Sequence, residues 1–226
     1  MKQYLKTNHS DIVRILRLTG YELGTLAAHW RGQFSLRQWK LLRSLRQSRG
    51  LKFNIASGRT SKSGWVNVDI SPTVDIRMDL RRRIPLSAGS AAMIFCEHFC
   101  DHLNFPNEIS RFLSECHRLL EPGGRARFVL HDAEGLLRAA IQRDAHYFEV
   151  AEQVWPTIME AVNFLFRFND AHQFLYDYQT FERLLLATGF AQVTRGKYRQ
   201  SDCQELLLDF VHPSREGMSM YIDVVK

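Results

Sequence analysis

The chain has 226 residues, 45% of them hydrophobic, and a formal net charge of +6. This length and composition suit one globular domain with a sizeable core and argue against a disordered chain. Its apolar runs are shorter than the roughly 18 to 20 residues that cross a membrane, and no secretory signal follows the first residues, so a cytoplasmic protein is expected. The four cysteines have neither the spacing of a metal or redox motif nor the density of a disulfide framework.

The positive charge is concentrated in residues 1–50. That segment holds ten Lys or Arg residues against two acids, whereas residues 51–226 hold 20 against 22. Such a basic arm is able to contact a nucleic acid, a charged glycan or an anionic membrane surface, and the last of these would make the protein membrane-peripheral. The plainer interpretation is a solvated helix face. We therefore expect a basic helical arm attached to a domain over residues 51–226.

Two helices are expected in this arm. Ser10 precedes an apolar pattern of helical period and predicts a capped helix that ends near Thr19 and Gly20. A second helix is expected to start at Ser35, with apolar side chains on one side and Lys and Arg on the other. A basic amphipathic helix can lie on a membrane, but packing against its own domain is the commoner arrangement.

From Leu51 onward, short apolar runs alternate with stretches of helical period, which is typical of a parallel sheet covered by helices. The expected strands are Leu51 to Ile55, Trp65 to Asp69, Val74 to Met78, Met93 to Cys96 and Arg125 to His131, with a closing antiparallel pair at 190–193 and 218–224. The expected helices are 107–120 and 178–187, and an aromatic-rich helical lid covers 133–176. The fold class is therefore α/β, a doubly wound, mostly parallel sheet with an antiparallel edge and an N-terminal helical arm.

The connection between the first two strands is short. About nine residues join them, which is near the lower limit for a parallel crossover, so no full helix fits there. We expect the helix around residues 35–48 to cover part of the sheet face that this leaves bare.

Three features fall at strand ends, where open α/β sheets bind ligands: the turn Ala56-Ser57-Gly58, then Asp69 and Asp79. The single glycine excludes a dinucleotide fingerprint, and no Gly-Lys-Ser/Thr of a P-loop follows. What remains is a loop whose amides can hold a carboxylate, beside an acid that can accept two hydrogen bonds from a ribose diol. S-adenosylmethionine carries both groups, although each signal alone is also typical of an ordinary turn or cap.

Several ordered motifs together are more specific. They read Asn54-Ile55-Ala56-Ser57-Gly58, Gly64-Trp65-Val66-Asn67-Val68-Asp69, Asp75-Ile76-Arg77-Met78-Asp79-Leu80, Glu97-His98-Phe99-Cys100-Asp101-His102-Leu103 and Leu119-Leu120-Glu121-Pro122-Gly123-Gly124. In this order they resemble the class I S-adenosylmethionine-dependent methyltransferases, over about residues 50 to 226. The most similar branch is often associated with glycan or small-molecule modification.

The resemblance implies an enzyme with a Rossmann-like fold that moves a methyl group from S-adenosylmethionine to a small-molecule or sugar acceptor by in-line displacement. It implies that residues 56–58 form the cofactor loop and that Asp69 holds the ribose. Asp79 and Leu80 would lie beside the adenine, and Glu97 would border the methionine end. The family has glycine where this chain has Ala56, so a non-catalytic scaffold of the same fold is an alternative.

Histidines are the candidate catalytic groups, because an oxygen or nitrogen acceptor loses a proton on methylation. The candidates are His98, His131 and His172, with Asp132 as an expected orienting partner. The stretch His98-Phe99-Cys100-Asp101-His102 also approximates an inverted zinc-protease motif. Aspartate replaces the required glutamate, and no third ligand is evident in the sequence, so no metal site is expected.

The other alternative is a nucleic-acid or membrane-surface binder that acts through residues 1–50. Its interaction would be sensitive to salt, because it would depend on the Lys and Arg side chains of the arm. RNA methylation would combine this alternative with enzymatic activity.

Overall fold

The computed structural model describes residues 11–149 and 155–226. Seven strands form one sheet in the order β3-β2-β1-β4-β5-β7-β6. The strands are β1 (Leu51–Ile55), β2 (Val66–Asp69), β3 (Ile76–Arg77), β4 (Ala91–Glu97), β5 (Leu120–His131), β6 (Gln192–Gly196) and β7 (Ser219–Val225). Neighbours from β3 to β5 are parallel, and β7 is antiparallel to both β5 and β6. The predicted doubly wound sheet with an antiparallel edge is confirmed.

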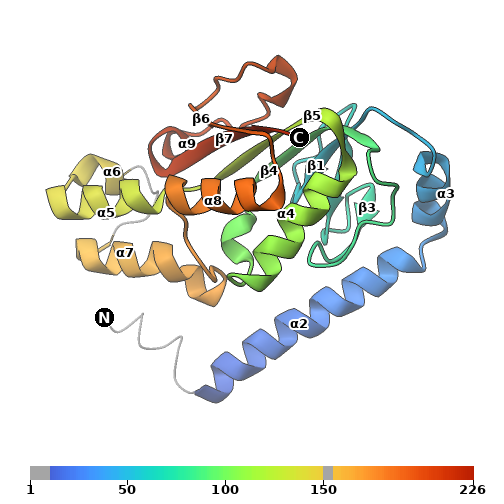
Figure 1. Ribbon diagram of the computed structural model, residues 1–226. Helices are drawn as coiled ribbons and strands as arrows, with labels where there is room; N and C mark the ends of the chain where they lie inside the picture. The colour runs from blue at the N-terminus through green and yellow to red at the C-terminus, as the bar shows by residue number, and fades with distance from the viewer. Residues whose placement is uncertain (1–10, 150–154) are drawn as a thin grey trace.

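The helices cover this sheet and extend it at two ends (Figure 1). They are α2 (Asp11–Gln33), α3 (Leu36–Leu45), α4 (Asn107–Leu119), α5 (Ala133–Gln142), α6 (Ala145–Glu149), α7 (Ile158–Arg167), α8 (Tyr178–Thr188) and α9 (Pro213–Met218), with short 3-10 turns η1 (Cys100–His102), η2 (Phe168–Asp170) and η3 (Gln204–Leu206). Helices α4 and α8 lie side by side over one face of the sheet. None of the helices within the described residues is both long and apolar enough to cross a membrane.

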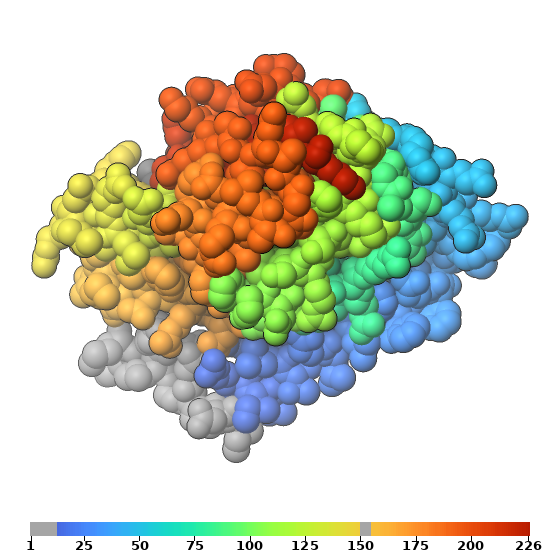
Figure 2. Space-filling view, viewed as in Figure 1, coloured from blue at the N-terminus to red at the C-terminus, as the bar shows by residue number. Residues whose placement is uncertain are grey.

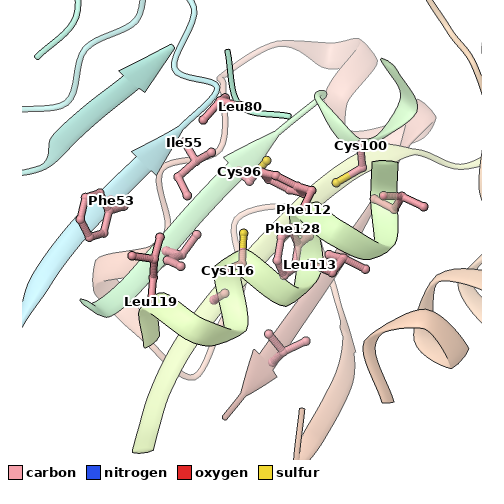
Figure 3. Close-up of a cluster of buried hydrophobic side chains, with 14 of the residues drawn as sticks. Phe53, Ile55, Leu80, Cys96, Cys100, Phe112, Leu113, Cys116, Leu119 and Phe128 are labelled. Carbon is pink, nitrogen blue, oxygen red and sulfur yellow. The ribbon is translucent and has the colours of Figure 1, made fainter. Parts of the chain in front are cut away.

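The main core lies between α4, α8 and the sheet. Phe53 and Ile55 of β1 and Phe128 of β5 are fully buried there, against Phe112 and Leu113 of α4 (Figure 3). Burying each such side chain contributes roughly 1.5–3 kcal/mol, so this layer supplies much of the stability and holds the strand ends in a fixed arrangement. Figure 2 shows α8 and α4 forming the front surface, with α2 along the lower edge.

Helix α2 continues well beyond the end expected from the sequence. The predicted stop near Thr19 and Gly20 is wrong, because the helix runs to Gln33, and Ser10 lies outside the described residues. Tertiary contacts at the far end outweigh the cost of interior glycines, which is about 1 kcal/mol each. Gly32 is needed there, since a Cβ at this position would lie 2.0 Å from the carbonyl oxygen of Arg77 in β3.

No helix joins β1 to β2, as the short connection predicted. Helix α3 starts after Ser35, whose hydroxyl accepts the N–H of Gln38, and its leucines pack into the main core. The expectation that α3 covers the face left bare is wrong, because that face carries Asn54 and Asn67. The connection itself covers it: the amide of Asn54 donates to Asn67 and to the carbonyl of Thr60.

Helices α5, α6 and α7 form a second, smaller cluster at one end of the sheet. Leu136 of α5 and Val162 and Leu165 of α7 are buried together, with aromatic side chains packed around them. Figure 1 shows α5, α6 and α7 grouped beyond α8, away from α3. This group borders the carboxyl end of β5, where His131 is located.

Candidate functional site

The predicted cofactor loop and the acid after β2 meet in the structure. Gly58 donates its N–H to Asp69 Oδ2 over 3.0 Å, and Ser71 donates to Asp69 Oδ1 over 2.8 Å. The N–H groups of Ala56 and Ser57 both point to the carbonyl oxygen of Val68. All three loop amides therefore have acceptors within the protein, which differs from the open amide cradle expected from the sequence.

Two details of the loop bear on ligand binding. Ala56 has φ of 58°, in the left-handed region that favours glycine. Ser57 is buried, and its hydroxyl has no hydrogen-bond partner within the described residues. A buried polar atom without a hydrogen-bond partner costs free energy. A polar ligand that bonded to the Ser57 hydroxyl would remove this cost.

A cavity of about 410 Å³ lies beside Asp69, at the carboxyl ends of β2 and β3. This volume is in the range of small-molecule sites. Asp69, Asp79 and Leu80 line it, so three of the predicted cofactor residues share one cavity, whereas residues 56–58 and Glu97 are not among its lining residues. The apolar part of the wall comes from Ile70, Met78, Leu80, Phe99 and Leu103.

Asp79 is buried at the cavity wall and paired with Arg81, whose Nε lies 3.0 Å from Asp79 Oδ1. Burial alone would raise the pKa of Asp79, but the hydrogen bonds and charge of Arg81 lower it below its ordinary value. Arg81 also binds Glu22 of α2 at 2.7 Å. Arg81 is thus held between two carboxylates of the protein.

Helix α2 forms one wall of this cavity, which the sequence did not predict. Leu18 and Tyr21 of α2 line it. Glu22 is held by Arg81, and Arg17 forms an ion pair with Asp170 of η2. No local sequence signal identified these residues, because the expected helix ended before most of them and the contacts join segments far apart in the chain.

Residues 54–128 match a family described as "Methyltransferase domain". This segment of the chain is thus similar to methyltransferase domains. The strand order 3-2-1-4-5-7-6 with its antiparallel edge is the fold of class I S-adenosylmethionine-dependent methyltransferases. Together the match and the fold support S-adenosylmethionine as the cofactor and methyl transfer as the activity.

Solved structures with a similar fold include an S-adenosylmethionine-dependent methyltransferase from Archaeoglobus fulgidus, with 13% identity, 84% of this chain and 92% of that chain covered, and a TM-score of 0.49. A possible histamine N-methyltransferase from Thermotoga maritima has 16% identity, coverage of 92% and 96%, and a TM-score of 0.47. Phosphoethanolamine N-methyltransferase 2 of Haemonchus contortus, in complex with S-adenosylmethionine, has 13% identity, coverage of 82% and 51%, and a TM-score of 0.46. No curated protein matches the sequence.

The residues at the first cavity fit S-adenosylmethionine. The carboxylate of Asp69 has lone pairs left after its two backbone contacts and is able to accept the ribose hydroxyls. The apolar wall around Leu80 suits a purine ring. The unpartnered Ser57 hydroxyl lies outside the lining of this cavity, in the loop that Asp69 holds. When bound, this cofactor supplies an electrophilic methyl group on a sulfonium centre.

A second cavity of about 440 Å³ brings together the three predicted catalytic histidines, His98, His131 and His172. His102 lines both cavities, so its side chain lies in the wall between them. The other lining residues are Phe164, Leu165, Phe168, Phe210, His212, Ser214, Arg215, Met218 and Ser219. An acceptor in this cavity would be next to the cofactor cavity.

His98 and His131 are in direct contact. Their Nδ1 atoms lie 3.2 Å apart, and His131 Nδ1 is also 3.0 Å from Asp101 Oδ2. On its other side, His98 Nε2 lies 3.0 Å from the hydroxyl of Ser219 and 2.7 Å from Arg215 Nη1. His98 has φ of 51°, a strained conformation for a non-glycine residue that is typical of functional positions.

The prediction that Asp132 orients a catalytic histidine is wrong. Asp132 caps α5 by accepting the N–H of Gly135 and pairs with Arg195, whereas Asp101 contacts the His131 ring. Asp101 belongs to the motif from Glu97 to Leu103, but the sequence did not predict its role. Its contact with His131 depends on how β4 and β5 pair.

The inverted zinc motif does not assemble as a histidine pair. His102 Nδ1 lies 3.0 Å from the carbonyl oxygen of Ala171, away from His98 Nδ1, which faces His131. Burial lowers the pKa of His102, although its hydrogen bond to Ala171 opposes this.

Burial also sets the protonation of the other rings in this cavity. It lowers the pKa of His98 well below the usual value and, together with the charge of His131, lowers that of His172 to about 4. His172 Nδ1 donates to the carbonyl oxygen of Leu165 over 2.6 Å. Both rings are therefore neutral near pH 7, where they are able to position an acceptor but are weak bases.

Glu97 lies behind this cavity. Its Oε2 accepts the N–H of Phe210, and its Oε1 lies 3.4 Å from Arg215 Nε. Burial raises the pKa of Glu97 above its ordinary value, although Arg215 opposes this. Its contacts support the segment around Phe210 and Arg215.

Proposed function

We propose that this methyltransferase modifies a small molecule or a sugar that binds in the histidine-lined cavity. The observation that carries the proposal is the shared wall at His102, because it puts the histidine-lined cavity directly beside the cavity that suits the cofactor. The volume of about 440 Å³ is suited to a small ligand rather than to a folded macromolecule.

The proposed roles at the cofactor cavity follow from these contacts. Asp69 binds the ribose hydroxyls, and Asp79 and Leu80 lie beside the adenine. Ser57 contacts the amino acid part, while Ala56 and Gly58 keep the loop in place through their backbone contacts. Glu97 acts at a distance, by holding Arg215 against the second cavity.

At the acceptor cavity, His98, His131 and His172 are proposed to contact the acceptor. Methyl transfer depends mainly on holding the acceptor atom in line with the sulfonium methyl group at contact distance. Phe164 and Phe168, from the region 133–176, also line this cavity, and Phe168 stacks on His172 with ring centroids 5.0 Å apart. We propose that this region is a lid over the acceptor.

The first experiment is calorimetric titration of the protein with S-adenosylmethionine, followed by incubation with methyl-labelled cofactor and small-molecule or sugar fractions. We expect label in a low-molecular-weight product. Phe168→Ala should raise the Michaelis constant for that acceptor and leave cofactor affinity unchanged. Label found only in protein or RNA would overturn the proposed acceptor class without affecting the assignment of the cofactor.

We also propose that the α2–α3 surface binds an anionic membrane. Leu16, Leu23 and Trp30 lie seven residues apart on one side of α2, and they are 65%, 61% and 48% exposed. Phe34 and Leu36, at the junction with α3, are 80% and 76% exposed. An apolar stripe of this size is unusual on a soluble surface and is typical of interaction sites.

Charge favours a membrane over the other partners for this surface. Basic residues follow the stripe along the chain, with Arg31 in the last turn of α2 and Arg37, Lys40 and Arg43 in α3. A second copy of the chain would bring like charges together, and a nucleic acid would gain nothing from exposed leucines. An anionic lipid surface satisfies both the apolar and the basic groups.

Cosedimentation with phosphatidylcholine vesicles, with and without phosphatidylserine, tests this proposal. Binding should require phosphatidylserine and weaken with salt. The double variant Leu16→Gln and Leu23→Gln should bind more than about tenfold less, because each leucine contributes roughly 1.5–3 kcal/mol when buried in lipid. Ile141→Gln, at an exposed apolar position on α5, is the matched control. Equal binding by the variant and the control would refute membrane docking through this surface.

A further inference from the structure

The contact between His98, Asp101 and His131 is inconsistent with ordinary hydrogen bonding. Arg215 Nη1 can only donate, so at 2.7 Å it requires a lone pair on His98 Nε2. A neutral His98 ring then carries its proton on Nδ1, which points at His131 Nδ1. His131 Nδ1 must accept that proton, so it cannot also donate to Asp101 Oδ2 at 3.0 Å.

The opposite tautomers also fail. If His131 donates to Asp101, then His98 Nδ1 presents a lone pair and its Nε2 carries the proton. That proton suits Ser219 Oγ at 3.0 Å but opposes the N–H of Arg215. With neutral rings and an ionised carboxylate, no assignment of protons satisfies every contact of His98 and His131.

One buried carboxylate atom nearby, Oδ1 of Asp101, has no hydrogen-bond partner within the described residues, and its side chain is 0% exposed. Oε1 of Glu97 also lacks a hydrogen bond there, but it forms an ion pair with Arg215. An unpaired carboxylate oxygen in a buried position is costly unless a cation is present. Asp101 is therefore a buried negative charge that points to a missing positive partner.

Two of the separations between the ligand atoms match those around a metal ion. His98 Nδ1, His131 Nδ1 and Asp101 Oδ2 are separated by 3.2 and 3.0 Å along the contacts, and the atoms that these residues offer all lie within 4.8 Å of one another. Ligands bonded to one ion at about 2.1 Å and at right angles lie about 3.0 Å apart. Two histidines and one carboxylate form a ligand set known for divalent transition metals.

We propose that His98, Asp101 and His131 bind a divalent first-row transition metal at the inner end of the histidine-lined cavity. The metal takes the lone pairs of both Nδ1 atoms and the charge of Asp101, which removes the conflict. His98 Nε2–H then donates to Ser219, and Arg215 turns from His98 toward its ion-pair partner Glu97, whose Oε1 is 3.4 Å from Nε. One ion thus removes the proton conflict and neutralises the buried Asp101 carboxylate.

Such an ion is able to bind the acceptor directly. This step rests on the proposed function. Three protein ligands leave positions open toward the cavity, where an acceptor hydroxyl can bind and lose its proton to water more readily. The oxygen lone pair then attacks the methyl carbon, and the carbon–sulfur bond breaks as its electron pair returns to sulfur. The acceptor class is therefore a small molecule with a hydroxyl group.

The test is metal binding by the full chain without cofactor or acceptor, so its result does not depend on methyl transfer. Protein stripped with chelator is titrated with Mn²⁺, followed by electron paramagnetic resonance, and with Co²⁺, followed by visible absorption. We expect one ion per chain and cobalt bands with histidine nitrogen ligands. No saturable binding of either ion would overturn the proposal.

Variants locate the ion. His131→Gln and Asp101→Asn should each weaken binding by more than roughly a hundredfold, because even residues that only orient metal ligands cost 10–100-fold. His172→Gln, in the same cavity but outside the ligand set, should bind as the wild type does. Thermal melting with and without Mn²⁺ serves as the second readout: the ion should raise the melting temperature of the wild type and His172→Gln only. Equal binding by all the variants would refute this ligand set.

Discussion

Gly58 and Asp69 are joined by a hydrogen bond of 3.0 Å between the backbone N–H of the glycine and the carboxylate of the aspartate. The same carboxylate accepts the N–H of Ser71 over 2.8 Å. One side chain therefore fixes the loop after β1 and the turn after β2 to each other. It also lines the cofactor cavity, so structure and binding depend on the same atoms.

We predict that Asp69→Ala lowers the affinity for S-adenosylmethionine by about tenfold to a hundredfold, because hydrogen bonds to a charged group contribute roughly 1.5–3 kcal/mol each. The free energy of unfolding should also fall, by about 1–3 kcal/mol, since the N–H groups of Gly58 and Ser71 lose their acceptor. Calorimetric titration and urea denaturation measure the two effects.

Asp75→Ala is the matched control for this variant. Asp75 Oδ2 accepts the backbone N–H and the side-chain amide of Asn67, each over 2.9 Å, but it does not line the cavity. We expect lower stability with unchanged cofactor affinity. If Asp75→Ala weakened cofactor binding as much as Asp69→Ala, the loss would reflect unfolding of the loop rather than a contact with the ribose.

Ala56→Gly should stabilise the protein by roughly 0.5–1 kcal/mol. Ala56 has φ of 58°, which costs an L-residue about 1–2 kcal/mol, and this exceeds the entropy that glycine loses on folding. Cofactor affinity should not decrease. Ala27→Gly, at an exposed position inside α2, should instead destabilise by about 1 kcal/mol. A lower urea midpoint for Ala56→Gly would show that the methyl group contributes packing that outweighs the backbone strain.

The sheet was predictable because its signals are local. Apolar runs such as Leu51–Ile55 are bounded by turn residues, and the order of parallel strands follows from the short connections. The length of α2 was not predictable, because two glycines and a polar face gave a stop signal that the contacts of Gly32 and His29 override. Such contacts depend on the position of β3, which the sequence of α2 does not indicate.

The site shows the same division. The sequence placed Asp69 and His131 at carboxyl ends of strands, and parallel strands bring such ends to one edge. The partners were not predictable, because Asp101 of η1 meets His131 only when β4 pairs with β5, and Arg215 of α9 and Ser219 of β7 meet His98 only when β7 joins the sheet. Motifs identify residues within one loop, whereas the contacts between His98 and β7 require the complete sheet.

Substitution of Arg127 should destabilise the protein more than substitution at the other positions of the sheet. It is 0% exposed on β5, its Nε and Nη2 donate to Asp209 at 2.8 and 3.0 Å, and its Nη1 donates to Asp223 at 2.8 Å. Arg127→Met should destabilise by about 3–5 kcal/mol, because the buried Asp209 carboxylate is left without its partner. Urea denaturation measures the change.

Two further variants separate charge from packing at Arg127. The double variant Arg127→Met and Asp209→Leu should recover much of the loss, because both charges are removed together. Asp223→Asn should cost less than Arg127→Met, since the Asp223 side chain is 22% exposed and remains hydrated. A double variant no more stable than Arg127→Met alone would indicate that the hydrogen bonds to backbone carbonyls, rather than the unpaired charge, dominate.

The free energy of unfolding should decrease below pH 6.5 because of His29. This residue of α2 is buried against the segment that follows β3. Its Nδ1 accepts the N–H of Asp79 over 3.3 Å, and only an unprotonated nitrogen can do so. Burial lowers the pKa of His29 from 6.5, the charge of Arg82 lowers it further, and Asp79 partly opposes this. The unfolded chain then binds the proton first, so the stabilisation is complete above pH 6.5 and is lost as the pH falls toward the lower pKa of the folded state.

Urea denaturation at pH 7.5 and pH 5.5 should show a smaller loss of stability for His29→Gln than for the wild type, because the side-chain oxygen of glutamine keeps the contact. His146→Gln, at an exposed position on α6, is the control and should lose as much as the wild type. An equal loss in all three proteins would assign the pH dependence to other histidines.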